Sequence, residues 1–145
     1  MSDVLTLSQV RMPGAARSKD DAIREAGQIL VDAGAVDPDY IDSMFDRERS
    51  VSTYMGNYLA IPHGTNESKE SIKRSALSVI RYPEPIDWDG NEVLFALGIA
   101  GYQGGHMDIL SRIAIVFSDT DEVDKLVAAR SAEELYNLLN AVNQE

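Results

Sequence analysis

The two histidines, His63 and His106, are the side chains of this sequence best suited to covalent chemistry. His63 lies in Pro62-His63-Gly64, directly after a predicted strand, and His106 follows two glycines at the predicted start of a helix. Ligands of α/β proteins bind in loops that follow strands, and the first turn of a helix offers amide donors to an anion. If the fold brings the two histidines together, one imidazole can carry a phosphoryl group while the other hydrogen-bonds it.

Each histidine also has a simpler interpretation. His63 can be an ordinary residue of a surface turn, and His106 an ordinary residue beside a glycine turn. A metal site is a weaker alternative, because the two histidines lack a His-x-x-x-His spacing and a catalytic metal site takes three protein ligands. Asp108 is the nearby carboxylate that could contribute to one. We therefore expect neither a metal nor a cofactor.

A phosphoryl dianion in transit is stabilised by a fixed positive charge that engages its oxygens in pairs, which arginine does better than lysine. Arg47 and Arg49, at the end of a predicted helix, are the candidates, although each also fits an ordinary solvated helix end. The hydroxyls of Thr53 and Thr65 could orient an imidazole or a phosphate. Most loop hydroxyls have no such role, so both threonines are secondary candidates.

Two consecutive helices are predicted ahead of the His63 segment. Ser18 is a natural N-cap for a helix over 18–34, which should close at a glycine. A second helix is predicted over 37–49, with Asp37 as its N-cap and Pro38 at its first helical position. Both helices carry apolar residues on one face, which indicates that each covers a core.

The rest of the chain alternates between strand and helix patterns. Compact apolar runs predict strands over 58–61, 76–82 and 93–100, with 83–90 joining the last two. Helical spacing returns in 109–117, 123–127 and 135–142, with Asp119 or Thr120 and Ser131 as caps. Helices flank the strands on both sides, which favours an α/β fold: a three-layer α/β/α arrangement with a small mixed β-sheet covered by helices on both faces.

Length and composition predict one domain over residues 1–145, because 145 residues is close to the usual size of a single domain and no linker or repeat divides the chain. The 13 basic and 24 acidic residues give a formal charge of −11, which disfavours nucleic acid and bare membrane as partners and favours a basic protein surface. The absence of cysteine excludes disulfides, thiolate metal sites and a cysteine nucleophile.

No segment has the length of apolar sequence that spans a bilayer, so we expect a cytoplasmic protein with no direct membrane insertion.

Three motifs in order resemble a known family. They are Asp46-Arg47-Glu48-Arg49, Thr53-Tyr54-Met55-Gly56 and Ala60-Ile61-Pro62-His63-Gly64-Thr65, followed by His106. Together they resemble the mannitol/fructose-class IIA module (EIIA type 2) of the bacterial phosphoenolpyruvate-dependent sugar phosphotransferase system, and most of all its mannitol-type members. The resemblance runs over nearly the whole chain.

The resemblance implies a role for each candidate residue. His63 matches the histidine that accepts a phosphoryl group from the phosphocarrier protein HPr, as a tele-phosphohistidine, and passes it to a IIB protein or domain of a IIBC sugar permease. His106 matches a histidine that stabilises the phosphoryl group, Arg47 matches an arginine that stabilises charge, and Thr53 matches a supporting hydroxyl. Relatives often have a polar or acidic residue directly before the second histidine, whereas this chain has Gly105.

Two alternatives to a transport role remain open at this point. One is a nitrogen-related regulatory IIA protein, which acts through phosphorylation-dependent binding to another protein. The other is a non-catalytic α/β interaction domain in which both histidines are structural. The sequence does not distinguish among polyols or sugars, because substrate choice belongs to the membrane domain.

Overall fold

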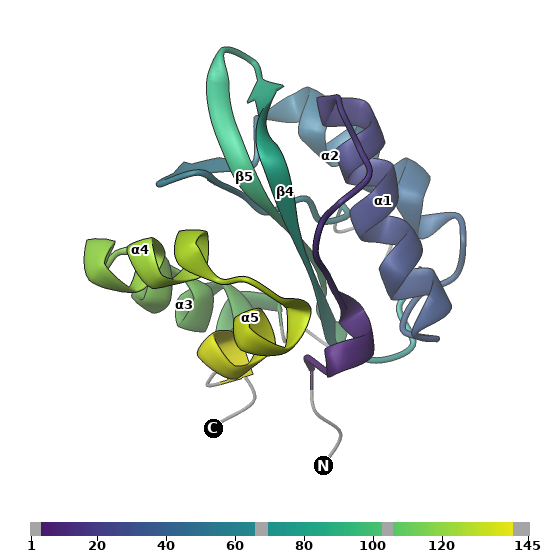
Figure 1. Cartoon of the computed structure of the whole chain (residues 1–145). Helices are drawn as coiled ribbons and strands as arrows, with labels where there is room; N and C mark the ends of the chain where they lie inside the picture. The colour runs from purple at the N-terminus through teal and green to yellow at the C-terminus, as the bar shows by residue number, and fades with distance from the viewer. Residues whose placement is uncertain (1–3, 66–69, 103–105, 141–145) are drawn as a thin grey trace.

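A computed structural model describes residues 4–65, 70–102 and 106–140. Within these residues, five strands form one mixed sheet in the order β1-β4-β5-β3-β2. The elements along the chain are the 3-10 turn η1 (Leu7–Gln9), β1 (Val10–Arg11), α1 (Lys19–Asp32), α2 (Tyr40–Ser50), β2 (Tyr54–Gly56), β3 (Leu59–Ala60), β4 (Ala76–Trp88), β5 (Asn91–Ala100), α3 (His106–Phe117), α4 (Thr120–Ala128) and α5 (Ala132–Leu139). Helices α1 and α2 lie on one side of the sheet and α3, α4 and α5 on the other (Figure 1). The predicted three-layer α/β/α class with a mixed sheet is confirmed.

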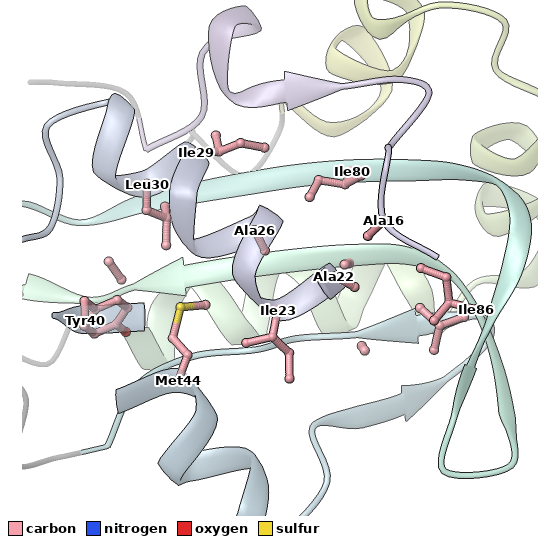
Figure 2. Close-up of a cluster of buried hydrophobic side chains, with 14 of the residues drawn as sticks. Ala16, Ala22, Ile23, Ala26, Ile29, Leu30, Tyr40, Met44, Ile80 and Ile86 are labelled. Atoms are coloured by element: carbon pink, nitrogen blue, oxygen red, sulfur yellow. The ribbon is translucent and has the colours of Figure 1, made fainter. Parts of the chain in front are cut away.

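Strands β4 and β5 form the antiparallel centre of this sheet. Their side chains alternate between two apolar layers, as the two-residue period of a strand requires. Leu77 and Val79 belong to the layer beneath α3, α4 and α5, whereas Ile80 and Tyr82 belong to the layer beneath α1 and α2. Figure 2 shows the second layer, with Ala26 of α1 among the side chains packed against the two strands. Both faces of the central pair are therefore buried over residues 76–80 of β4 and 93–100 of β5, whereas 83–85 and 91–92, toward the β4–β5 turn, are exposed.

The connection predicted over 83–90 is wrong in extent. Strand β4 continues to Trp88, and the tight turn to β5 is made by Asp89 and Gly90, which have φ values of 55° and 93°. The register of β4 against β5 shifts between Arg81 and Ile86. Two prolines lie in that interval, and since proline has no N–H to donate, an irregular stretch of ladder accommodates them.

Three of the predicted helix caps are present. Ser18 accepts from Asp21 N at 3.2 Å at the start of α1. Asp119 and Ser131 cap α4 and α5 in the same way. Helix α1 ends at Asp32, just before the predicted glycine, and the predicted end of the last helix near 142 lies outside the described residues.

The predicted start of α2 at Asp37 is wrong. Residues 37–39 form a turn in which Tyr40 N donates to Asp37 O at 3.0 Å, and the helix begins at Tyr40. The two acidic side chains of this turn bond to a distant segment: Asp39 accepts from Ser71 Oγ at 2.8 Å and Asp37 pairs with Lys73 at 3.1 Å. The carboxylates of both aspartates are thus occupied by tertiary contacts, and the Asp39 side chain makes no capping bond to α2.

A short hairpin that was not predicted precedes the His63 segment. Strand β2 pairs antiparallel with β3, and Asn57 and Tyr58 turn between them with φ values of 50° and 68°. The predicted strand over 58–61 is reduced to Leu59–Ala60, which pairs parallel with Phe95 and Ala96 of β5. None of the helices in the described part of the chain combines the length and apolar composition needed to cross a membrane.

Gly98 lies where β5 packs tightly against Ala26 of α1. A Cβ at this position would lie 2.5 Å from Ser78 Oγ and 3.2 Å from the carbonyl oxygen of Ala26. Ser78 Oγ itself donates to Ala26 O at 2.9 Å, and Gly98 N donates to Ser78 Oγ at 3.2 Å. The glycine therefore allows a hydroxyl to join helix and sheet next to Ile99, a residue that pairs with the His63 segment.

We expect Gly98→Ala to lower the free energy of unfolding by about 2 kcal/mol, because the added methyl group overpacks this contact. Urea unfolding followed by circular dichroism measures the loss. The double variant Ser78→Ala/Gly98→Ala removes the closest atom, so its loss should be smaller than the sum of the two single losses. Additive losses, or an unchanged midpoint for Gly98→Ala, would show that the close approach does not constrain the fold.

Candidate active site

The segments that carry the two histidines leave the sheet from the same edge. Strands β3 and β5 are adjacent and parallel, so their carboxyl ends coincide. The chain that follows β3 reaches His63, which pairs with Ile99 in an isolated parallel bridge. The chain that follows β5 reaches His106 at the first position of α3. The position of the His106 side chain lies outside what the structure describes.

The imidazole of His63 is held in one tautomer. Its Nδ1 lies 2.8 Å from the carbonyl oxygen of Ile61. A carbonyl oxygen can only accept, so Nδ1 carries the proton and donates it. In the neutral ring the lone pair then lies on Nε2. The half-buried imidazole of His63 therefore has its unprotonated nitrogen at Nε2.

Two side chains of α2 hold the backbone that follows His63. The hydroxyl of Tyr40 accepts from Gly64 N at 2.8 Å and donates to Ile99 O at 2.7 Å. Ser43 Oγ accepts from Thr65 N at 2.8 Å and lies 3.2 Å from Thr65 Oγ1. Burial raises the pKa of Tyr40 to about 12, against a smaller opposing contribution of the Gly64 hydrogen bond. Thr65 is a candidate in the sequence, whereas Tyr40 and Ser43 are not, because these side-chain bonds join them to residues more than twenty positions away.

The structure distinguishes the two candidate arginines. Arg47, in the last turn of α2, is half-buried, and its Nη1 donates to Val51 O at 2.8 Å just after the helix ends. Arg49 is exposed and pairs with Asp46 on the same helix. The positive charge of Arg49 is therefore paired with a neighbouring carboxylate in solvent. The guanidinium of Arg47 is instead half-buried and held by a backbone carbonyl.

Thr53 is linked to the His63 segment through its backbone. Its carbonyl oxygen accepts from Ile61 N at 3.0 Å, two residues before His63. Its side chain is buried, and Oγ1 donates to Glu48 Oε1 at 2.5 Å while its amide donates to Glu48 Oε2 at 2.9 Å. The hydroxyl of Thr53 thus anchors the strand that leads to His63.

Glu48 is a buried carboxylate that ties several elements together, and it is only 6% exposed. Besides Thr53, it accepts from Trp88 Nε1 at 3.1 Å and lies 3.7 Å from Lys19 Nζ. In the sequence, Glu48 looks like part of a charged helix end. Tyr40, Met44 and Glu48 follow one another at intervals of four residues. This spacing puts all three on one face of α2, which is the buried face.

A hollow next to the His63 loop is strongly acidic. Thr65 and Ser43 border it, and its other lining residues include Asp42, Asp46 and Glu70. These carboxylates disfavour a phosphate ligand in the hollow itself. Among the described side chains, no group of three or more histidine, aspartate or glutamate residues is arranged to hold a metal ion.

Comparison with known proteins assigns the family. Residues 3–142 match the family model described as "Phosphoenolpyruvate-dependent sugar phosphotransferase system, EIIA 2". The chain belongs to this family. It is a phosphotransferase component, and the resemblance seen in its motifs extends over its full described fold.

The EIIA 2 assignment is supported by relatives that match end to end. The chain is 48% identical over 141 residues, which is 97% of each protein, to the mannitol-specific phosphotransferase enzyme IIA component of Halalkalibacterium halodurans. The crystal structure of IIA mannitol from Escherichia coli superposes with a TM-score of 0.86 at 30% identity, covering 93% of this chain and 98% of that one. A complex of enzyme IIAMTL and phosphorylated enzyme IIBMTL from Escherichia coli gives a TM-score of 0.86 at 29% identity, covering 93% and 96%.

In this EIIA, removal of the Thr53 hydroxyl should loosen the Glu48 cluster. We expect Thr53→Val to lower the free energy of unfolding by about 2 kcal/mol, because a buried carboxylate loses a charge-assisted hydrogen bond. Trp88 is the single tryptophan and donates to the same carboxylate, so its fluorescence during urea unfolding reports this cluster directly. Thr120→Val, at an exposed position, is the matched control. Equal losses in the two variants would contradict the anchoring role of Thr53.

Proposed function

We propose that this EIIA accepts a phosphoryl group from phosphorylated HPr on Nε2 of His63 and passes it to a IIB protein or domain of a mannitol-class IIBC permease. The hydrogen bond from His63 Nδ1 to Ile61 O carries this proposal, because it directs the ring lone pair to Nε2. The 48% identity to a mannitol-specific relative and the similarity to a IIA protein solved with phosphorylated IIB support the substrate class and the acceptor.

The transfer step needs no cofactor. The Nε2 lone pair of His63 forms a bond to phosphorus as the bond between phosphorus and the donor breaks, and the electron pair of that bond stays with the donor. The proton on Nδ1 remains on the ring, held by Ile61 O at 2.8 Å. The onward step reverses these events toward IIB, so the protein contributes position and electrostatics.

Three further residues have proposed roles in this step. Arg47 supplies positive charge to the equatorial oxygens of the phosphoryl group. His106, at the start of α3, stabilises the same oxygens, where the amides of a helix N-terminus favour negative charge. Thr53 supports the site through its bond to Ile61 N rather than by contact with the phosphoryl group.

The proposed role also implies where the protein acts. We place the transfer in the cytoplasm, because the phosphoryl groups of the system come from phosphoenolpyruvate, an intracellular metabolite. We treat residues 1–145 as a single domain, which agrees with a family match over residues 3–142.

A purely regulatory, nitrogen-related role is disfavoured by the mannitol-specific relative. Restoration of mannitol phosphorylation in membranes that contain IIBC would distinguish the two roles.

We expect His63→Asn to take up no acid-labile, alkali-stable phosphate from phosphoenolpyruvate, enzyme I and HPr. The asparagine amide can still donate to Ile61 O in place of Nδ1, but it has no atom equivalent to the nucleophilic Nε2. Radiolabelled transfer followed by acid and base treatment measures this. His106→Ala retains the nucleophile and should still be labelled, more slowly. Labelling of His63→Asn at the wild-type level would refute the assignment.

We expect Arg47→Ala to lower the rate constant of phosphoryl transfer by about 100-fold, the usual effect of removing one positively charged or donor group from a transition state. Arg49→Ala is the matched control, since Arg49 is exposed and paired with Asp46, and its rate should stay within about twofold of wild type. Rapid-quench measurement of HPr-dependent labelling gives both rates. Similar losses in both variants would indicate a general charge effect instead.

A further inference from the structure

Tyr40 is a buried side chain that touches the His63 segment and that the transfer step above does not use. It is the first residue of α2, and it is 2% exposed. Its hydroxyl lies between two backbone groups, accepting from Gly64 N at 2.8 Å and donating to Ile99 O at 2.7 Å. The bond to Ile99 O uses the single donor of the phenol, and the bond from Gly64 N uses its oxygen as an acceptor.

The hydroxyl of Tyr40 lies at the end of the parallel pairing between His63 and Ile99. Ile99 N donates to Pro62 O at 3.1 Å, which is one rung of a regular ladder. In such a ladder the next rung runs from Gly64 N to Ile99 O, because each residue bonds to the two neighbours of its partner. The hydroxyl of Tyr40 bonds to both of these groups, at the place where the chain leaves the sheet.

His63 is consequently anchored on both sides. Its ring is held by Ile61 O through Nδ1, and the peptide that follows it is held by Tyr40 through Gly64 N. Ser43 repeats the arrangement one residue later by accepting from Thr65 N at 2.8 Å. Because α2 also carries Arg47, one rigid helix sets the position of the nucleophile segment and of the proposed positive charge.

We propose that Tyr40 is a positioning residue for phosphoryl transfer, which fixes the direction of Nε2 by bridging Gly64 N and Ile99 O. This inference rests on the proposed function of His63. Misplacement of a reacting atom by about 1 Å can cost about 100-fold in rate. Burial keeps the phenol protonated, with its pKa raised to about 12, so the hydroxyl can donate and accept at the same time throughout the neutral range.

The test compares two buried tyrosines. Tyr40→Phe removes the bridging hydroxyl and keeps the ring that fills the core. Tyr82→Phe removes the hydroxyl of another buried tyrosine, one that donates to Glu25 at 2.9 Å, away from the His63 loop. Single-turnover labelling by phosphorylated HPr over a range of HPr concentrations gives the maximal rate constant and the half-saturating concentration for each variant.

We expect Tyr40→Phe to lower the maximal rate constant by about tenfold with little change in half-saturation, since positioning affects the reacting atoms and not the docking of HPr. Tyr82→Phe should stay within about twofold of wild type. The amide of Gly64 should also exchange with deuterium faster in Tyr40→Phe than in Tyr82→Phe. If Tyr40→Phe does not fold, Ser43→Ala provides the second variant, with an expected loss of about threefold in the same rate constant.

The possible failures are distinguishable. A wild-type protein that carries no phosphate on His63 would overturn the proposed function and the role of Tyr40 with it. Normal labelling of His63 in wild type, together with equal rate constants for Tyr40→Phe and Tyr82→Phe, would overturn the role of Tyr40 alone. Equal losses in both variants would show that the effect of Tyr40 is one of core stability.

Discussion

The side chains of β4 and β5 alternate between two apolar layers, and over residues 76–80 and 93–100 both faces of this strand pair are buried. Such a pair requires helices on both faces, which accounts for the placement of α1 and α2 on one side and α3, α4 and α5 on the other (Figure 1). It also leaves no room for a polar site in the middle of the sheet. Reactive groups must lie where strands end, and the parallel pairing of β3 with β5 brings two strand ends to one edge, from which the His63 and His106 segments leave.

Helix α2 connects the core to that edge. Met44 packs into the layer beneath α1, while Tyr40 and Ser43 bond to the loop that follows His63. At the other end of the helix, Glu48 accepts from Thr53, whose carbonyl oxygen receives the amide of Ile61. The helix is therefore bonded to the chain before and after His63, so that a displacement of α2 would move the His63 segment and Arg47 together.

The features that could be predicted from the sequence are those decided by nearby residues. Ser18, Asp119 and Ser131 cap helices because a cap needs only the amides of the next turn, and the prediction for His63 rests on the equally local Pro-His-Gly motif. The misplaced start of α2 has the opposite cause, since Asp37 and Asp39 bond to residues more than thirty positions away. Tyr40, Ser43 and Glu48 were missed as site residues for the same reason. Their roles depend on which distant backbone groups the fold brings to them.

The carbonyl and the two hydroxyls that anchor the His63 segment in the bonds described above are uncharged. A carbonyl holds Nδ1, and hydroxyls of Tyr40 and Ser43 hold the following amides. A carboxylate at Nδ1 would fix the same tautomer, but it would place a negative charge about 6 Å from the incoming phosphoryl dianion. At an effective dielectric of about 20, that repulsion is roughly 3 kcal/mol per unit charge, enough to slow transfer by about 100-fold. A neutral carbonyl sets the tautomer without this repulsion, and the buried carboxylate of Glu48 is linked to the His63 segment through Thr53. In a protein with a net charge of −11, neutral anchors are consistent with the proposal that Arg47 and the start of α3 supply the electrostatics of the site.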